Sequence, residues 1–331
     1  FYRYDGYSFK TYKSNLYHPT LLSNNNILCL EEDIENRLWI GTDKGLNVLL
    51  RKTGEIKQIK RIEFINNSIS ALRSTRNGKL FIGTDQGLFC YDYNTDSCTL
   101  YNRQNTNGIF PETPVKSLLE DSHGHLWIGT WNQGLFRYDL AKNRFYAYPR
   151  MLPKSAHVIF EDSKKRIWIG TWGSGLYVLE NAYDPDNVRW KSFSHENGNA
   201  KSLPHDIIYS ISEDINSRNI WIGTSLGLSI LNDESKGTFT NFYPSEKDET
   251  ISDAEVTSLL CDKQGMMWIG MLRGGVNTVS TRKPFFKSYP MKGLKQEFKT
   301  QTVSCILIDK DNQTLWMVIG TSGLIKYNLH N

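Results

Sequence analysis

The chain reads Leu126-Trp127-Ile128-Gly129-Thr130 and, three residues later, Gly134-Leu135, which is one of seven copies of a short pattern. In each copy an aromatic residue lies in an apolar run, a Gly-Thr or Gly-Met pair follows, and a glycine turn comes next. The last copy, around Trp316, is irregular. A unit that recurs in this way cannot bury its apolar side alone, so neighbouring copies must cover it.

The spacing of the copies identifies the kind of repeat. Separations of 42, 46, 41, 53, 47 and 48 residues lie between the aromatic positions Trp39, Phe81, Trp127, Trp168, Trp221, Trp268 and Trp316. Repeats of about 40–50 residues with several short strands are typical of β-propeller blades. Helical repeats have similar lengths, but the chain lacks long amphipathic stretches, and β-branched and aromatic residues alternate between turn residues instead.

Each copy predicts a blade of four antiparallel strands. In the third copy we expect strands at residues 115–121, 126–130, 135–138 and 144–148. The first strand of each blade should line the axis of the propeller. The glycine in the second strand lets neighbouring blades approach closely, since a side chain there would intrude. The aromatic residue before it should pack between blades.

The termini predict how the ring closes. The chain ends after an expected third strand at 324–327, and residues 7–12 look like a fourth strand. We therefore expect an all-β, seven-bladed β-propeller of four-stranded antiparallel blades, with the N-terminal strand completing the last blade and leaving no exposed sheet edge. Residues 1–331 form one propeller domain in this interpretation. Residues 2–5 resemble an isolated third strand, so we expect the chain to be a fragment of a longer protein.

Composition narrows the classes of partner. The 331 residues carry a net charge of +4 that is spread along the chain, without a Lys/Arg run, so nucleic acid is not an expected partner. The sequence has no transmembrane span or signal peptide. It has five cysteines, which we expect to be buried free thiols, although Cys90 and Cys98 could face each other and Cys29 and Cys305 take matching places in adjacent inner strands. No Cys-x-x-Cys pair indicates a zinc site, and we expect neither a metal nor a cofactor.

The sequence carries few catalytic signals. It has no Gly-x-Ser-x-Gly elbow, no phosphate-binding loop and no His-Glu-x-x-His helix. Acidic pairs such as Glu120-Asp121 and Glu161-Asp162 suggest the two carboxylates of a glycosidase. They recur at one blade position just before a hairpin turn, however, so we interpret them as groups that bond the turn backbone.

The loops that vary within the repeated frame predict a binding face. In a propeller, the loop between the second and third strands opens on the same face as the loop between blades. Trp131 and Trp172 occupy matching places on consecutive blades, and Arg273 lies across the ring. Aromatic faces beside polar or basic groups suit an acidic or neutral sugar, although these tryptophans could equally pack loop against loop. The candidate ligand-binding residues are Trp131, Asn132, Trp172, Arg273, Lys44, Asp85, His205 and Glu255.

The repeat resembles that of two-component regulator propellers. The resemblance rests on the pattern Leu-Trp-Ile-Gly-Thr, two or three residues, then Gly-Leu, preceded by an apolar strand that ends in Glu-Asp. It covers nearly the whole chain. The opening residues 2–9 also resemble the early part of sensor regions from hybrid two-component systems of gut Bacteroidetes.

This resemblance implies a function. It implies a periplasmic, non-catalytic sensor segment of an inner-membrane histidine kinase, which binds glycan-derived oligosaccharides and regulates polysaccharide-utilisation genes. It also implies an adjacent propeller and an immunoglobulin-like domain as partners, and a homodimeric parent protein. Two alternatives stay open: a propeller scaffold for protein–protein contacts, and a carbohydrate-active hydrolase or lyase that would use Asp43, Asp85, Asp206 and Glu255.

Overall fold

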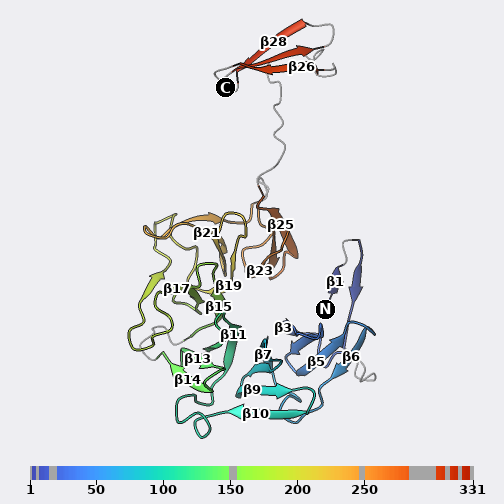
Figure 1. Cartoon of the computed structure of the whole chain (residues 1–331), viewed down its shortest axis with the longest axis vertical. Coiled ribbons are helices and arrows are strands. Elements are labelled where there is room, and N and C mark those ends of the chain that lie inside the picture. Colours follow the sequence, from blue (N-terminus) through green and yellow to red (C-terminus); the bar gives the residue numbers. More distant parts are fainter. Residues whose placement is uncertain are drawn as a thin grey trace. The chain divides into compact units, whose positions relative to one another are not determined.

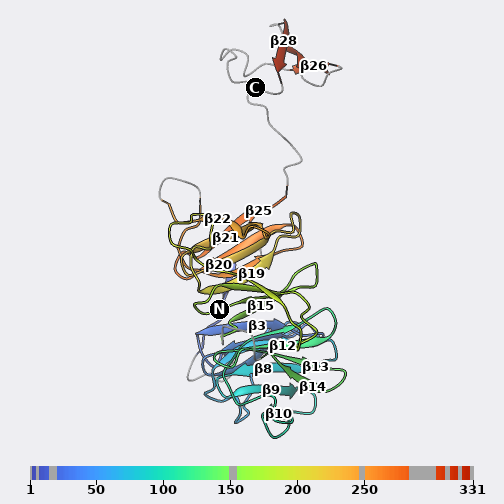
Figure 2. The ribbon, with the colours of Figure 1, turned by 90° about the vertical axis from the view of Figure 1, so that its left-hand side faces the viewer.

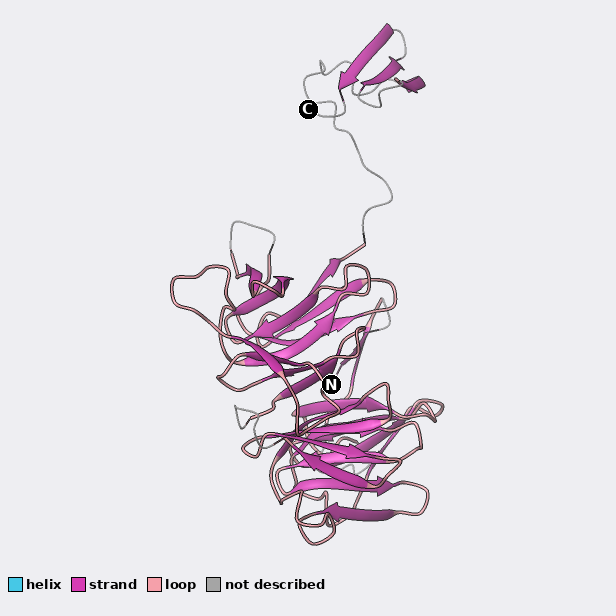
Figure 3. Cartoon of the chain, turned by 60° about the vertical axis from the view of Figure 1, so that its left-hand side comes forward, coloured by secondary structure: helices cyan, strands magenta, loops and turns pink. Residues whose placement is uncertain are grey.

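The computed structural model describes residues 2–4, 7–14, 21–148, 155–245, 250–282, 303–309, 314–319 and 323–328. The chain divides into two compact units, residues 1–282 and 283–331. The described secondary structure consists of strands and connecting loops (Figure 3). Within these residues no helix is long and apolar enough to cross a bilayer.

Besides a two-stranded N-terminal hairpin, the described part of the first unit contains six antiparallel sheets, which we call the first to sixth blades. Their innermost strands lie nearest a common centre (Figure 1), and the strands of each blade run side by side outward from it (Figure 2). Five blades have four strands and the sixth has three. The strands are β3 (Ile27–Glu32), β4 (Leu38–Thr42), β5 (Gly45–Leu50) and β6 (Glu55–Gln58); β7 (Ile69–Ser74), β8 (Leu80–Thr84), β9 (Gly87–Asp92) and β10 (Ser97–Tyr101); β11 (Val115–Glu120), β12 (His125–Thr130), β13 (Leu135–Asp139) and β14 (Arg144–Ala147); β15 (Val158–Glu161), β16 (Ile167–Gly170), β17 (Leu176–Leu179) and β18 (Trp190–Phe193); β19 (Ile208–Glu213), β20 (Ile220–Thr224), β21 (Gly227–Asp233) and β22 (Thr238–Phe242); and β23 (Val256–Cys261), β24 (Met266–Met271) and β25 (Val276–Ser280).

The second unit contains the last repeat. Its described strands β26 (Val303–Ile308), β27 (Thr314–Ile319) and β28 (Gly323–Asn328) form one antiparallel sheet of three strands. The irregular Gly-Thr segment of this repeat, residues 320–322, lies outside the described residues.

The prediction of seven blades closed by the N-terminal strand is wrong: the propeller has six blades. The expected closing strand, β2 (Phe9–Thr11), pairs with β1 (Tyr2–Tyr4) in a short hairpin, so its backbone groups are satisfied locally. Tyr12, just after β2, is buried against Leu22 and Ile40 of the first blade. The N-terminal segment therefore covers an apolar face of the first blade instead of adding a strand to the last sheet.

The predicted role of the second-strand glycines is confirmed. A Cβ atom added to Gly41 would lie 2.8 Å from the Ile69 carbonyl oxygen of the next blade. At Gly170 it would lie 2.6 Å from the Ile208 side chain, and at Gly223 2.5 Å from the Val256 carbonyl oxygen. Each of these partners is the first residue of the next inner strand, β7, β19 or β23. Only a residue without a side chain permits this approach.

In the first, third and fourth blades, the tryptophan two residues before this glycine packs between blades, as predicted. Trp39, Trp127 and Trp168 are at most 1% exposed, and Trp127 packs with Ile159 and Ile169 of the following blade. Each indole Nε1–H donates to an aspartate six residues earlier, at 2.7–2.9 Å. These pairs join the aromatic core to the hairpin turn, because the aspartate also accepts backbone N–H groups of that turn.

Asp121 illustrates why the acidic pairs are structural. Its Oδ1 accepts the backbone N–H groups of His123 and His125, both at 2.9 Å, and its Oδ2 accepts Trp127 Nε1–H. Burial opposes ionisation of this carboxyl, but these donors outweigh the burial and hold its pKa below the usual range. The carboxylate is fully occupied by the fold, which confirms the interpretation made from the sequence.

The glutamate of the pair connects neighbouring blades. Glu161, at the end of β15, accepts the backbone N–H and the hydroxyl of Ser122 on the preceding blade, at 2.8 and 2.7 Å. Glu213 does the same with Ser163, at 2.9 and 2.7 Å. The Glu-Asp pair thus holds its own hairpin turn through Asp and an adjacent turn through Glu.

The fifth blade departs from this pattern. Asp214 lies seven residues before Trp221, and its carboxylate accepts the hydroxyls of Ser217 and Thr281. Trp221 Nε1 is buried without a hydrogen-bond partner among the described residues. One additional residue in the turn has therefore separated the aspartate from the indole.

The glycine contact generates a stability prediction. We expect Gly223→Ala to destabilise the protein by about 2 kcal/mol or more, because the added methyl group collides with a backbone carbonyl that cannot move without separating two blades. Gly270→Ala is the matched control. Its Cβ would meet only the Ser258 side chain and its own blade, and that hydroxyl can rotate away. Urea unfolding measures both, and equal losses would contradict the inter-blade explanation.

Candidate functional site

The second-to-third-strand loops have a fixed shape because the threonine of the Gly-Thr pair closes them. Thr130 Oγ1 donates to the Gly134 carbonyl and Thr171 Oγ1 to the Gly175 carbonyl, both at 2.8 Å. The backbone then ties each loop to the segment that enters an inner strand. Trp131 N–H donates to Pro114 O at 2.9 Å. The two kinds of loop thus share one face, as predicted from the sequence.

An aromatic cluster spans the third to fifth blades on this face. The ring centroids of Trp131 and Trp172 are 5.5 Å apart, those of Trp172 and His157 5.0 Å, and those of Trp172 and Tyr209 5.6 Å. Trp131 and Trp172 remain 39% and 42% exposed. The two indoles therefore contact one another and still present apolar surface to solvent. We call Trp131, His157, Trp172 and Tyr209 the aromatic cluster.

A cavity of about 590 Å³ lies beside the cluster, among the inner strands. All six blades contribute to its wall, and His157 and Tyr209 belong both to the wall and to the aromatic cluster. Its polar lining residues include Asp43, Ser68, Ser70, Lys116, Ser117 and Thr257. The cavity wall combines polar, apolar and aromatic side chains, a composition that suits a small polar ligand.

Charged groups border the cluster at two places. Lys116 Nζ lies 3.0 Å from Asp85 Oδ1 and 5.9 Å from the centroid of the Trp131 ring. Tyr209 donates its hydroxyl to Glu255 Oε2 at 3.2 Å. Burial and the negative charge of Glu255 both raise the pKa of Tyr209, so the phenol stays protonated and keeps this hydrogen bond.

His157 has an unused hydrogen-bonding atom. Its Nδ1 is buried and has no partner among the described residues. Burial and, to a smaller extent, the nearby Lys116 charge lower the pKa of this imidazole to about 4. His157 is therefore neutral at physiological pH and offers one donor and one acceptor.

The structure brings only part of the predicted set together. Trp131 and Trp172 form the cluster, and Asp85 and Glu255 reach it through Lys116 and Tyr209. Asn132 follows Trp131 and accepts the Thr113 hydroxyl at 2.9 Å.

The other three predicted residues have no described hydrogen bond, ion pair or ring contact with the cluster. His205 Nδ1 accepts the Ile207 N–H at 3.0 Å, so it shapes its own loop. Lys44 and Arg273 are exposed, and their described bonds are backbone N–H groups that donate to Thr42 and Asp253. The role of these residues in binding stays a prediction.

Lys116, His157 and Tyr209 were missed in the sequence. Each lies at the start of an inner strand or just before it, within one residue of Val115, Val158 or Ile208. Comparing this position across the repeats could have found them, because residues there reach the cavity on the same face as the loops.

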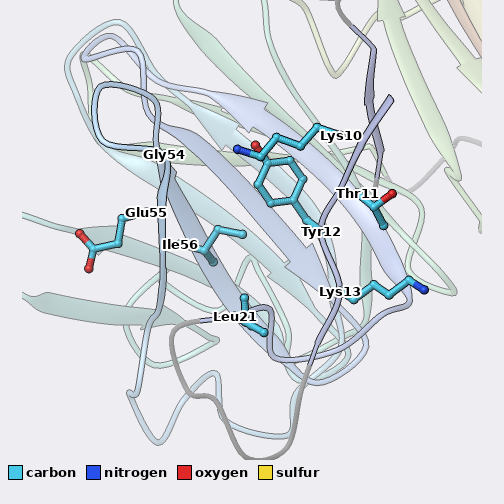
Figure 4. Close-up of a pocket in the computed structure, with 8 residues that line it drawn as sticks. All are labelled: Lys10, Thr11, Tyr12, Lys13, Leu21, Gly54, Glu55 and Ile56. Carbon is cyan, nitrogen blue, oxygen red and sulfur yellow. The ribbon is translucent and has the colours of Figure 1, made fainter. Parts of the chain in front are cut away.

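A second hollow, of about 720 Å³, lies between the N-terminal segment and β6 (Figure 4). Tyr12, Leu21 and Ile56 line it, and the charged ends of Lys13 and Glu55 point in opposite directions (Figure 4). Because its polar groups do not converge, the axial cavity is the stronger candidate site.

The buried imidazole generates a pH prediction. The pKa of His157 is about 4 in the folded protein and about 6.5 in an unfolded chain. Between these values the unfolded state binds a proton that the folded state does not, so stability falls as the pH decreases. We expect His157→Phe to weaken this dependence. Urea unfolding of both proteins across that window measures it, and a pH-independent difference between them would contradict the assignment.

Comparison with known proteins identifies the repeats. Residues 21–44, 109–132, 151–173, 202–225 and 250–273 match the two-component regulator propeller family. No curated protein sequence matches the chain significantly.

The fold has solved relatives. The extracellular domain of the hybrid two-component system BT4673 from B. thetaiotaomicron has a TM-score of 0.67 at 20% identity, over 100% of this chain and 41% of that one. The corresponding domain of BT3049 from the same organism has a TM-score of 0.56 at 22% identity, over 93% and 47%. Virginiamycin B lyase from Staphylococcus aureus has a TM-score of 0.55 at 11% identity, over 92% and 95%.

The chain spans less than half the length of the two sensor-system structures. At these identities the structural likeness concerns the fold, whereas the repeat motif is matched in the sequence itself. This chain is therefore built from two-component regulator propeller repeats, on the fold of the extracellular domains of Bacteroides hybrid two-component systems.

Proposed function

We propose that this chain is an extracytoplasmic, ligand-binding propeller of a hybrid two-component system and that it senses glycan-derived oligosaccharides. The repeat family and the solved relatives support the sensor assignment. The oligosaccharide assignment rests on the site itself. Its main support is the pair of exposed indoles, Trp131 and Trp172, beside a cavity with a polar lining.

Sugars suit this arrangement for a physical reason. One face of a pyranose ring presents C–H groups that stack on aromatic rings, while its hydroxyl groups need both donors and acceptors. Trp131 and Trp172 supply exposed aromatic faces. Lys116 and His157 in the cavity wall, with Glu255 beyond Tyr209, supply polar partners at one edge of that surface.

Other domains of the parent protein would transmit the effect of ligand binding from this chain to the kinase. A ligand that binds one arrangement of neighbouring domains more tightly shifts the population toward it, and a histidine kinase outside this segment reads the difference. An adjacent propeller, an immunoglobulin-like domain and a second copy of the parent are the proposed partners. The proposed output is regulation of polysaccharide-utilisation genes.

We propose a non-catalytic role for the segment. The four acids considered for catalysis are held by separate partners. Asp43 accepts Asn26 Nδ2–H, and Asp206 accepts the His195 N–H at 2.6 Å. Asp85 pairs with Lys116, and Glu255 accepts the Tyr209 hydroxyl. No described bond joins two of these carboxylates, and the lyase likeness at 11% identity concerns the fold alone.

The two indoles provide the test. We expect Trp131→Ala and Trp172→Ala each to weaken oligosaccharide binding at least about fivefold, because stacking on an aromatic face contributes on the order of 1 kcal/mol or more. Calorimetry against an oligosaccharide library measures this loss.

The chain offers a matched control for this experiment. Trp190 is 38% exposed, close to the exposure of the other two, but lies on β18, an outer strand. Trp190→Ala should bind as wild type does. If binding survives both cluster substitutions, or if Trp190→Ala is equally harmful, the site is assigned wrongly.

A further inference from the structure

The charges around the aromatic cluster discriminate between classes of sugar. Resting on the proposed function, we infer that this site selects an uncharged oligosaccharide and disfavours one that carries carboxylates. The aromatic faces can stack on uncharged and on acidic sugars alike. The inference therefore rests on the charged groups that border these faces.

Carboxylates outnumber cations at the site. Asp43 lines the cavity, Asp85 lies against Lys116, and Glu255 lies against Tyr209. Lys116 is the one ammonium group in the cavity wall among the described residues, and Asp85 already neutralises it at 3.0 Å. Together, Asp43, Asp85, Glu255 and Lys116 carry three negative charges and one positive charge, so this set repels an added anion.

An acidic sugar would gain little in exchange. To pair with Lys116, the carboxylate of an acidic sugar would have to displace Asp85. This exchange replaces one ion pair by another and leaves the Asp85 carboxylate unpaired beside the ligand. Like charges within a Debye length of about 8–10 Å repel one another without full screening. Lys44 and Arg273 do not line the cavity, so neither is placed to form a direct ion pair with a carboxylate bound there.

An uncharged sugar uses the same groups without this cost. Its hydroxyls can donate to Asp85 and Glu255 and accept from Lys116 while every existing charge stays in place. A hydroxyl can also pair with the neutral imidazole of His157, which lines the cavity. A neutral imidazole matches a hydroxyl because each offers both a donor and an acceptor.

The experiment compares sugars that differ only in charge. The probes are cellotriose, galactotriose and mannotriose, each with the counterpart whose primary hydroxyls are oxidised to carboxylates. For every pair that binds, we expect the neutral member to bind at least about tenfold more tightly at low salt. Raising the salt concentration should narrow that gap, because it screens repulsion and leaves the affinity of the neutral member nearly unchanged.

A charge-neutralising variant tests the cause. The double variant Asp85→Asn and Glu255→Gln keeps the side-chain shapes and removes two negative charges, so it should reduce the preference for neutral sugars at least about fivefold. Circular dichroism checks that it folds. An unchanged preference would contradict the electrostatic explanation.

The outcomes separate the two proposals. If oxidised sugars bind wild type as tightly as neutral ones or more tightly, and Trp131→Ala abolishes that binding, the charge selection is wrong while the sensor site stands. If neither member of any pair binds, both proposals are contradicted for these ligands. Neutral binding that depends on Trp131 and weakens on oxidation supports both.

Discussion

The approach of one blade to the next depends on the glycine in each second strand. At Gly41, Gly170 and Gly223 the backbone lies so close to the first residue of the following inner strand that a methyl group does not fit. The tryptophan two residues earlier on the same strand is buried between the same two sheets. A glycine and a large aromatic residue in fixed succession therefore set how closely these blades pack, with Phe81 in place of tryptophan in the second blade.

The two ends of each blade differ in how their polar side chains are used: one end carries the hairpin turns, and the other carries the loops between the second and third strands. At the hairpin end, the carboxylates of the Glu-Asp pair accept hydrogen bonds from the turn of their own blade and from the turn of an adjacent blade. Glu161, for example, accepts two hydrogen bonds from Ser122. At the opposite end, the threonine of each Gly-Thr pair closes a loop whose tip stays free to vary. The side chains available for recognition are consequently those of the loop tips and of the residues that begin the inner strands.

Part of the candidate site could be predicted because the repeat marks the loop positions directly. Trp131 and Trp172 follow Gly-Thr in consecutive blades, so their proximity follows from blade order. No motif in the sequence distinguishes Lys116, His157 and Tyr209. Whether a side chain on an inner strand points toward the axis or away from it depends on how that strand pairs with the second strand of its blade. A β-bulge at the start of β11 and β19 shifts that register, and it is visible only in the strand pairing. The same limit applies to Asp85 and Glu255, whose partners lie on other strands.

The sequence by itself determined the all-β architecture, the four-stranded blade, the glycine contacts and the structural role of the acidic pairs. Each of these follows from local residue types repeated at one spacing, because the same short-range packing problem recurs in every copy. The number of blades in the ring, the pairing of β2 with β1 and the membership of the cavity wall were decided by the tertiary structure. Those features depend on which strand pairs with a free sheet edge and which residues come together around the cavity. The local sequence allows several such partners, and only long-range packing selects one of them.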